Sequence, residues 1–124
     1  IRTVAGIPLN FTQSEVPLRG SAIECRINAL APGKLNFLHV PGGPFVRFDT
    51  FLVTGMTVTP FYDALLGKLI VYAGTREEAL RKMRAALCEL VIDGIPNNIE
   101  EQIALLGSAA FTDGSYHLGG VETQ

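Results

Sequence analysis

The chain has 124 residues, of which 48% are hydrophobic, and its formal net charge is −2 at pH 7. This composition is too apolar for an intrinsically disordered segment, and no basic tract is present to bind nucleic acid. The longest uninterrupted apolar run is Leu69 to Ala73, whereas a membrane-spanning helix needs about 18 residues. We therefore expect a single globular domain over residues 1–124, with neither a nucleic-acid partner nor a membrane partner.

Alternating apolar and polar residues predict a first strand over 21–29. Its apolar face consists of Ile23, Cys25 and Ile27, and its polar face consists of Glu24, Arg26 and Asn28. We expect the polar face to be solvated or covered by a partner domain, and the less favoured alternative is that it forms part of a site. A turn at 31–34 follows, and further strands are predicted over 35–40, 45–50 and 65–72. Residues 51–59 either extend the third strand or pair with it.

The hydrophobic period then changes from two to about 3.6 residues, which is typical of an amphipathic helix. Thr75 and Glu78 have the spacing of a capping box, in which each side chain accepts a backbone N–H of the other residue. The apolar positions of this helix are Leu80, Met83, Leu87, Leu90 and Val91. We expect the helix to end at Asp93-Gly94, a second helix to start at Asn98, and the Gly-rich segment 111–124 to be irregular. Strands that precede helices favour an α+β fold, with two helices packed on an antiparallel sheet.

Both cysteines, Cys25 and Cys88, lie in apolar patterns, and we expect them to be reduced and buried. The first residues contain no apolar stretch typical of a signal peptide, which favours a cytoplasmic protein. Because the chain begins with Ile1 instead of Met, we expect a piece of a longer protein.

The sequence contains no motif of a self-contained enzyme. Gly67-Lys68 suggests a phosphate-binding loop, but Tyr62 and Leu69 occupy positions where that motif requires Gly and Ser or Thr. His39 and His117 lie far apart and in no metal-binding pattern, so we expect no metal site in the chain. For His39, at the end of a predicted strand, a structural hydrogen bond is the favoured role.

One segment combines features of a binding site. Gly42 and Gly43 lie between two prolines, so that the backbone can approach another group closely while the loop stays stiff. Arg47 follows on a predicted strand and shares a face with Asp49. An arginine held in this way suits the binding of a negatively charged oxygen. The alternative interpretation is a surface arginine that is merely paired with Asp49.

Several segments, in the same order, resemble the C-terminal domain of biotin carboxylase. They are AIECRINA (22–29), LHVPGGP (38–44), VRFDT (46–50), PFYD (60–63), GKLI (67–70), TREEA (75–79) and ELVIDGI (89–95) followed by Asn97-Asn98. The resemblance extends over nearly the whole chain. It is closest to the bacterial acetyl-CoA carboxylase subunit, which serves fatty acid biosynthesis, although pyruvate, propionyl-CoA and methylcrotonyl-CoA carboxylases share these segments.

The resemblance implies a part of an ATP-grasp ligase, which makes carboxyphosphate from ATP and bicarbonate and then carboxylates N1 of biotin on the biotin carboxyl carrier protein. The ligands of ATP and magnesium would lie in an upstream ATP-grasp domain, so the isolated chain is expected to be inactive. The family arginine that contacts the ureido oxygen of biotin matches Arg47, and Gly42 and Gly43 would line the same site. Asp49 and Asp93 are candidates for holding Arg47 in place. The resemblance also implies a homodimer in the intact enzyme.

The chain departs from the family pattern after Ala29, where Leu30-Ala31 leads directly to Pro32-Gly33 and a longer acidic loop is missing. This departure favours a second hypothesis, a stand-alone binding module that keeps the fold without turnover. A third is the same domain of a pyruvate or acyl-CoA carboxylase, which changes the final acceptor and leaves the biotin reaction the same. If an upstream half is missing, we expect exposed apolar side chains where it docks, and self-association of the isolated domain.

Overall fold

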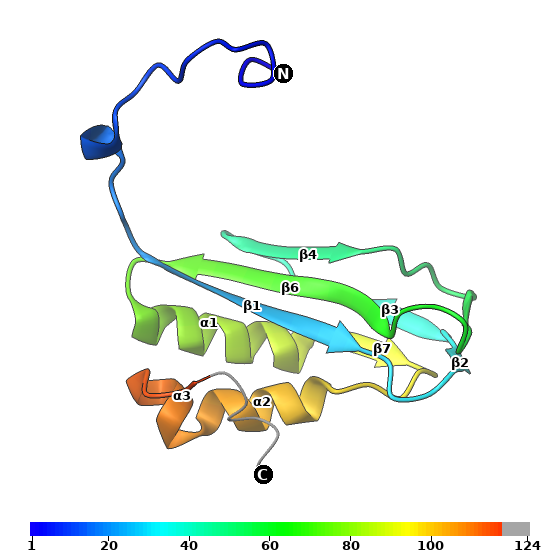
Figure 1. Ribbon diagram of the computed structural model, residues 1–124. Coiled ribbons are helices and arrows are strands. Elements are labelled where there is room, and N and C mark those ends of the chain that lie inside the picture. Colours follow the sequence, from blue (N-terminus) through cyan, green and yellow to red (C-terminus); the bar gives the residue numbers. More distant parts are fainter. Residues whose placement is uncertain (118–124) are drawn as a thin grey trace.

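The computed structural model describes residues 1–117, and it confirms the α+β class (Figure 1). A short 3-10 helix, η1 (Gln13–Glu15), precedes the domain. The elements that follow are β1 (Ser21–Asn28), β2 (Gly33–Lys34), β3 (Phe37–His39), β4 (Val46–Thr50), β5 (Thr57–Val58), β6 (Leu65–Ala73), α1 (Arg76–Glu89), β7 (Val91–Asp93), α2 (Ile99–Gly107) and α3 (Ala109–Asp113).

The main sheet is antiparallel and has three strands in the order β1-β6-β4, so that β6 pairs with both neighbours. Two small antiparallel pairs, β2-β5 and β3-β7, lie beside it. Segment 51–59 therefore does not extend the third strand or pair with it as expected, because its strand β5 pairs with β2. The helices cover one face of the main sheet (Figure 1).

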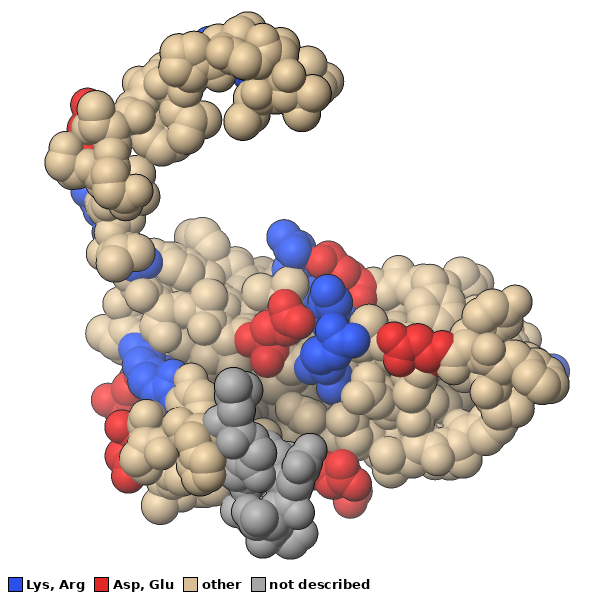
Figure 2. Space-filling model, in the orientation of Figure 1, with Lys and Arg blue, Asp and Glu red and all other residues tan. Residues whose placement is uncertain are grey.

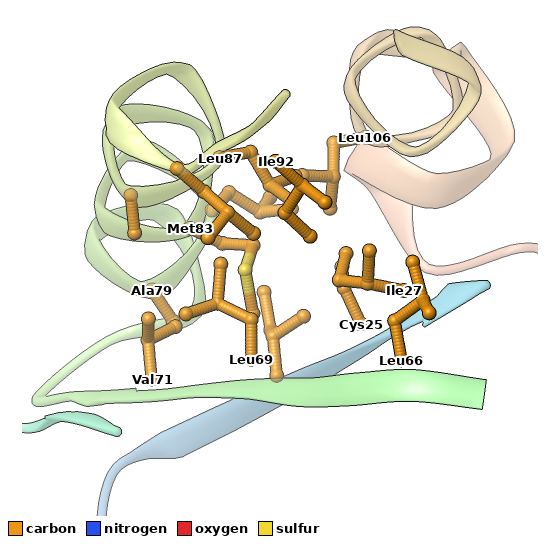
Figure 3. Packing of buried hydrophobic residues seen from close by; sticks show 14 of the residues in the cluster. Cys25, Ile27, Leu66, Leu69, Val71, Ala79, Met83, Leu87, Ile92 and Leu106 are labelled. Atoms are coloured by element: carbon orange, nitrogen blue, oxygen red, sulfur yellow. The ribbon is translucent and has the colours of Figure 1, made fainter. Parts of the chain in front are cut away.

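The core lies between this sheet and the helices (Figure 3). Its largest fully buried side chains include Ile27 from β1, Leu69 from β6, and Met83 and Leu87 from α1. Burial of one such side chain contributes about 1.5–3 kcal/mol to folding. Because successive strand residues alternate between the two faces of a sheet, this core also decides which residues lie on the outer face.

The start of α1 agrees with the sequence, and its end does not. The Glu78 N–H donates to Thr75 Oγ1 over 3.2 Å, and the Thr75 N–H donates to Glu78 Oε2 over 3.3 Å, which confirms the capping box. The helix ends at Glu89, and the expected end at Asp93-Gly94 is wrong. Residues 91–93 leave the helix because they pair with β3 as strand β7.

Two further expectations need correction. Cys25 is buried as predicted, but Cys88 is exposed because it lies just beyond the buried side of α1. Residues 111–113 belong to α3, whose first turn is capped by Ser108 Oγ, which accepts the Phe111 N–H over 3.3 Å. Residues 114–117 form no helix or strand, as expected, and the rest of the tail, from residue 118 onward, lies outside the described residues.

Residues 1–20 extend away from the domain as an arm (Figure 1), and every one of them is exposed. Apolar side chains of this arm, Val4, Leu9 and Leu18 among them, are therefore exposed, as are Phe61 and Tyr62 on the domain itself. Within residues 1–117, the helices are too short or too polar to cross a membrane.

Candidate functional site

Arg47 and Asp49 lie on β4, an edge strand that pairs with β6 on one side. Val46 and Phe48 are half-buried and pack against the core, and the alternation of a strand places Arg47 and Asp49 on the opposite, exposed face. The predicted common face of these two residues is thereby confirmed.

The two side chains form an ion pair. Arg47 Nη2 lies 2.8 Å from Asp49 Oδ2, and the side chains are 69% and 51% exposed. Such exposed pairs contribute only about 0.2–1 kcal/mol to stability. Within the described part of the chain, this is the one hydrogen bond of the Arg47 side chain. The remaining guanidinium N–H groups are thus free to bind another acceptor.

The outer face of the sheet brings further charged residues beside this pair. In the register of the three strands, Ile70 of β6 lies between Glu24 and Arg47, and Lys68 lies between Arg26 and Asp49. These two adjacent rows form the outer charged face, which consists of Glu24, Arg26, Arg47, Asp49 and Lys68. Basic and acidic side chains gather over the middle of the molecule in Figure 2. The face mixes both signs of charge and therefore suits a partner that is itself polar.

Sequence reasoning treated the polar face of β1 as separate from Arg47 and did not include Lys68 in the site. The alternation of Lys68, Ile70 and Tyr72 is a signal that places Lys68 on the outer side of β6. That Lys68 lies next to Asp49 follows from the pairing register of β4 and β6, which cannot be read from a local sequence pattern.

The predicted glycine loop lies next to the N-terminal end of β4. Gly43 has a φ of 115°, a backbone conformation that favours glycine, whereas at Gly42 an added Cβ meets nothing within 4 Å. Both glycines are exposed and, with Pro44, Lys82 and Glu89 among other residues, line a shallow pocket of about 210 Å³ against α1. The loop is thus open to a second molecule or domain.

His39 precedes the loop and has the structural role expected from the sequence. Its Nε2 lies 3.2 Å from Glu89 Oε1 at the end of α1, which ties β3 to the helix. Asp93, the second candidate for holding Arg47, ends β7 and has no hydrogen bond or ion pair with Arg47 in the described part of the chain. The structure brings Asp49 to Arg47 and leaves Asp93 apart.

Neither the buried thiol of Cys25 nor the potential metal ligands among residues 1–117 form a second reactive site. Burial, with a smaller effect of the neighbouring Glu24, raises the pKa of Cys25 to about 11, so that this thiol is protonated at neutral pH and unreactive. In residues 1–117, no group of three or more His, Cys, Asp or Glu side chains is arranged to hold a metal ion. The described residues therefore contain no preformed metal site with three or more protein ligands.

Comparison with known proteins identifies the family. The biotin carboxylase C-terminal domain family matches residues 24–123. The chain is 43% identical to biotin carboxylase of Haemophilus influenzae over 95% of its own length and 28% of that protein. It is also 41% identical to the chloroplastic biotin carboxylase of Arabidopsis thaliana, over 92% of its own length and 23% of that protein.

Solved structures agree in fold. The biotin carboxylase domain of Hydrogenobacter thermophilus 2-oxoglutarate carboxylase, a dimer in complex with MgADP, ADP and bicarbonate, superimposes with a TM-score of 0.90 at 34% identity. This alignment covers 98% of the chain and 28% of that structure. The biotin carboxylase subunit of pyruvate carboxylase gives a TM-score of 0.89 at 35% identity, over 98% of the chain and 29% of that structure.

The chain thus spans between 23% and 29% of the length of these four relatives, and it aligns along almost its whole length. Helices α1 to α3, the glycine loop with Arg47, and the sheet apart from the first three residues of β1 all fall in the matched region. The chain belongs to the biotin carboxylase family, and it corresponds to the C-terminal domain.

Proposed function

We propose that this domain binds and orients biotin, presented on a carrier protein, for carboxylation at N1 within an ATP-dependent biotin carboxylase. The observation that carries the proposal is the exposed guanidinium of Arg47, held by Asp49 on a strand that starts beside an open glycine loop. A planar cation with free N–H donors suits the ureido oxygen of biotin.

Arg47 would act on the charge that develops during the reaction. When N1 of biotin loses its proton, negative charge builds on the ureido oxygen, and a guanidinium held in place stabilises that charge. N1 then forms a bond to the carboxyl carbon of carboxyphosphate while the bond between that carbon and the phosphate oxygen breaks, and the departing phosphate takes up the proton lost from N1. Asp49 would orient the guanidinium in advance, because its carboxylate occupies one N–H of Nη2 and restricts rotation of the side chain.

The rest of the reaction would take place on parts of the enzyme outside this chain. Residues 1–117 hold no cluster of metal ligands, and the relatives are more than three times as long. We assign ATP and magnesium to an upstream ATP-grasp domain, and we expect the assembled enzyme to be a homodimer that receives the biotin carboxyl carrier protein. The isolated chain is accordingly expected to release no ADP in the presence of bicarbonate.

The experiment is a comparison of Arg47→Ala and Arg47→Lys with the unaltered full-length parent enzyme. Removal of one preorganised donor is expected to lower the biotin-dependent carboxylation rate by about 10²–10³-fold. Arg47→Lys keeps the charge but not the planar fork and is expected to recover only part of the rate. An Arg47→Ala enzyme that carboxylates biotin at the unaltered rate would exclude this function of Arg47.

A further inference from the structure

The first residues of the arm end like an α-helix. The Gly6 N–H donates to the backbone oxygen of Thr3, and the Ile7 N–H donates to that of Arg2, both at 3.1 Å. Gly6 itself has a φ of 73°, in the left-handed region. Two such hydrogen bonds around a left-handed glycine form the Schellman motif, which closes the C-terminal end of an α-helix. Residues 1–6 thus have the geometry of a last helical turn.

This turn has little to hold it in place within residues 1–117. It contains one hydrogen bond of the α-helical type, from the Ala5 N–H to the backbone oxygen of Ile1 at 3.0 Å. A single helical turn is unfavourable in water, because several dihedral angles are fixed for one hydrogen bond. All residues of the arm are exposed, so the domain does not bury the turn (Figure 1). A stable turn here requires a longer helix before it and a surface that packs on it.

The composition of the arm indicates what kind of surface it contacts. Residues 3–14 include no charged residue. Several large apolar side chains of the arm are at least half exposed, namely Ile1, Val4, Leu9, Phe11 and Leu18. Ile1 and Val4 lie three residues apart and are therefore neighbours on the surface of the helical turn. An exposed apolar stretch of this kind marks an interaction site, and an uncharged, apolar partner surface fits it.

The arm joins the domain at Gly20. A Cβ at Gly20 would clash with the Tyr72 hydroxyl and with the backbone oxygen of Ala73, and the φ of Gly20 is 68°. The Tyr72 hydroxyl also donates to the backbone oxygen of Arg19 at 3.3 Å. The next residue, Ser21, begins β1 and pairs with Ala73 of β6. The fold of the domain thus starts at Ser21, and Gly20 fixes the direction in which the arm leaves the sheet.

The family comparison divides the chain near the same point. The matched C-terminal domain begins at residue 24. The alignments with the Haemophilus influenzae protein and the Hydrogenobacter thermophilus structure cover 95% and 98% of the chain, so they include most of the arm. We infer that residues 1–19 belong to the preceding part of the parent protein, where residues 1–6 end an α-helix and the arm packs on an apolar surface. This inference rests on the hydrogen bonds and the exposure of the arm, and it is independent of any role of Arg47.

The first test is hydrogen exchange of residues 1–7 in the full-length parent protein and in the isolated 124-residue chain. In the parent, the backbone amides of Ala5, Gly6 and Ile7 should exchange about 100-fold or more slowly than in an unstructured peptide, as expected for a packed helix. In the isolated chain, they should exchange nearly as fast as in that peptide. Equal exchange in the two proteins, whether fast or slow, overturns the inference.

The second test is thermal unfolding of Leu9→Asp and of its matched control, Asn10→Asp, in both proteins. Leu9→Asp places a charge in the inferred apolar contact and should lower the unfolding temperature of the parent by about 5 °C or more. Asn10→Asp adds the same charge at the neighbouring polar position and should leave that temperature unchanged. In the isolated chain, where Leu9 is 63% exposed, both variants should unfold like the unaltered chain.

Leu9→Ala replaces Leu9→Asp if the aspartate variant of the parent does not fold, and it should cause a smaller shift in the same direction. If the substitution of Leu9 leaves the parent unchanged, the arm does not pack on the preceding part and the inference fails. The inference also fails if the isolated chain is destabilised as much as the parent, because Leu9 then contacts the C-terminal domain itself.

Discussion

Gly67 lies on β6, beside the strand that carries Arg47, and its replacement by alanine is the sharpest test of how these two strands pack. Gly67 is buried in β6 opposite Thr50. A Cβ at this position would lie 2.6 Å from Cζ and 2.7 Å from Cε2 of Phe48, and 3.0 Å from the backbone oxygen of Asp49. The φ of Gly67 is not positive, so that any destabilisation comes from crowding alone.

Two effects of Gly67→Ala oppose each other. Alanine restricts the unfolded chain and thereby stabilises the fold by about 0.4–1 kcal/mol. Overpacking of a well-packed site costs about 1–3 kcal/mol, because side chains leave their rotamers and the backbone shifts. The contact with the backbone oxygen of Asp49 cannot be relieved by a side-chain rotation, so crowding should exceed the entropic gain. We expect a net loss of about 1–2 kcal/mol in the free energy of unfolding.

The assay is urea unfolding of Gly67→Ala, with Gly42→Ala as the matched control. Gly42 has open space around its Cβ position and no positive φ, so this control is expected to be neutral or slightly stabilising. In the full-length enzyme, Gly67→Ala should also slow biotin carboxylation, because Phe48 follows Arg47 directly on β4 and Asp49 accepts the hydrogen bond of the Arg47 side chain. Equal stability of the two variants would refute the packing of Phe48 on Gly67.

Three further predictions follow from the core, the helix cap and the buried thiol. Met83→Ala should lower the free energy of unfolding by about 2–5 kcal/mol, measured by urea titration, since Met83 is fully buried. Thr75→Ala should cost about 1 kcal/mol in the same assay, and Thr75→Ser should restore most of it. A thiol reagent at neutral pH should modify Cys88 and not Cys25 in the folded chain, and modification of both would contradict the burial of Cys25. Because the folded pKa of Cys25, about 11, lies above the ordinary thiol value of 9.0, stability should fall as pH rises between these values. Cys25→Ala should flatten that decline.

Local signals were enough for several elements of the fold. The capping box marked the start of α1, and alternation located β1 almost to the residue. The strand predicted over 65–72 agrees with β6 (Leu65–Ala73). The end of α1 was missed because Leu90 and Val91 fit a helical stripe as well as a strand. Pairing of β7 with β3 decided between these possibilities, and that pairing joins segments more than fifty residues apart.

The sequence by itself determined that Arg47 and Asp49 share one face of a strand, because side chains alternate along any strand. Only the tertiary structure decided that Glu24, Arg26 and Lys68 lie beside them, because the register β1-β6-β4 is set by which residues enter the core. The same holds for Lys82 of α1, whose Nζ donates to the backbone oxygen of Pro44, just before β4, because α1 packs on β6. Contacts within a strand or a helical turn follow from short-range spacing, whereas contacts between elements depend on how the whole chain buries its apolar surface.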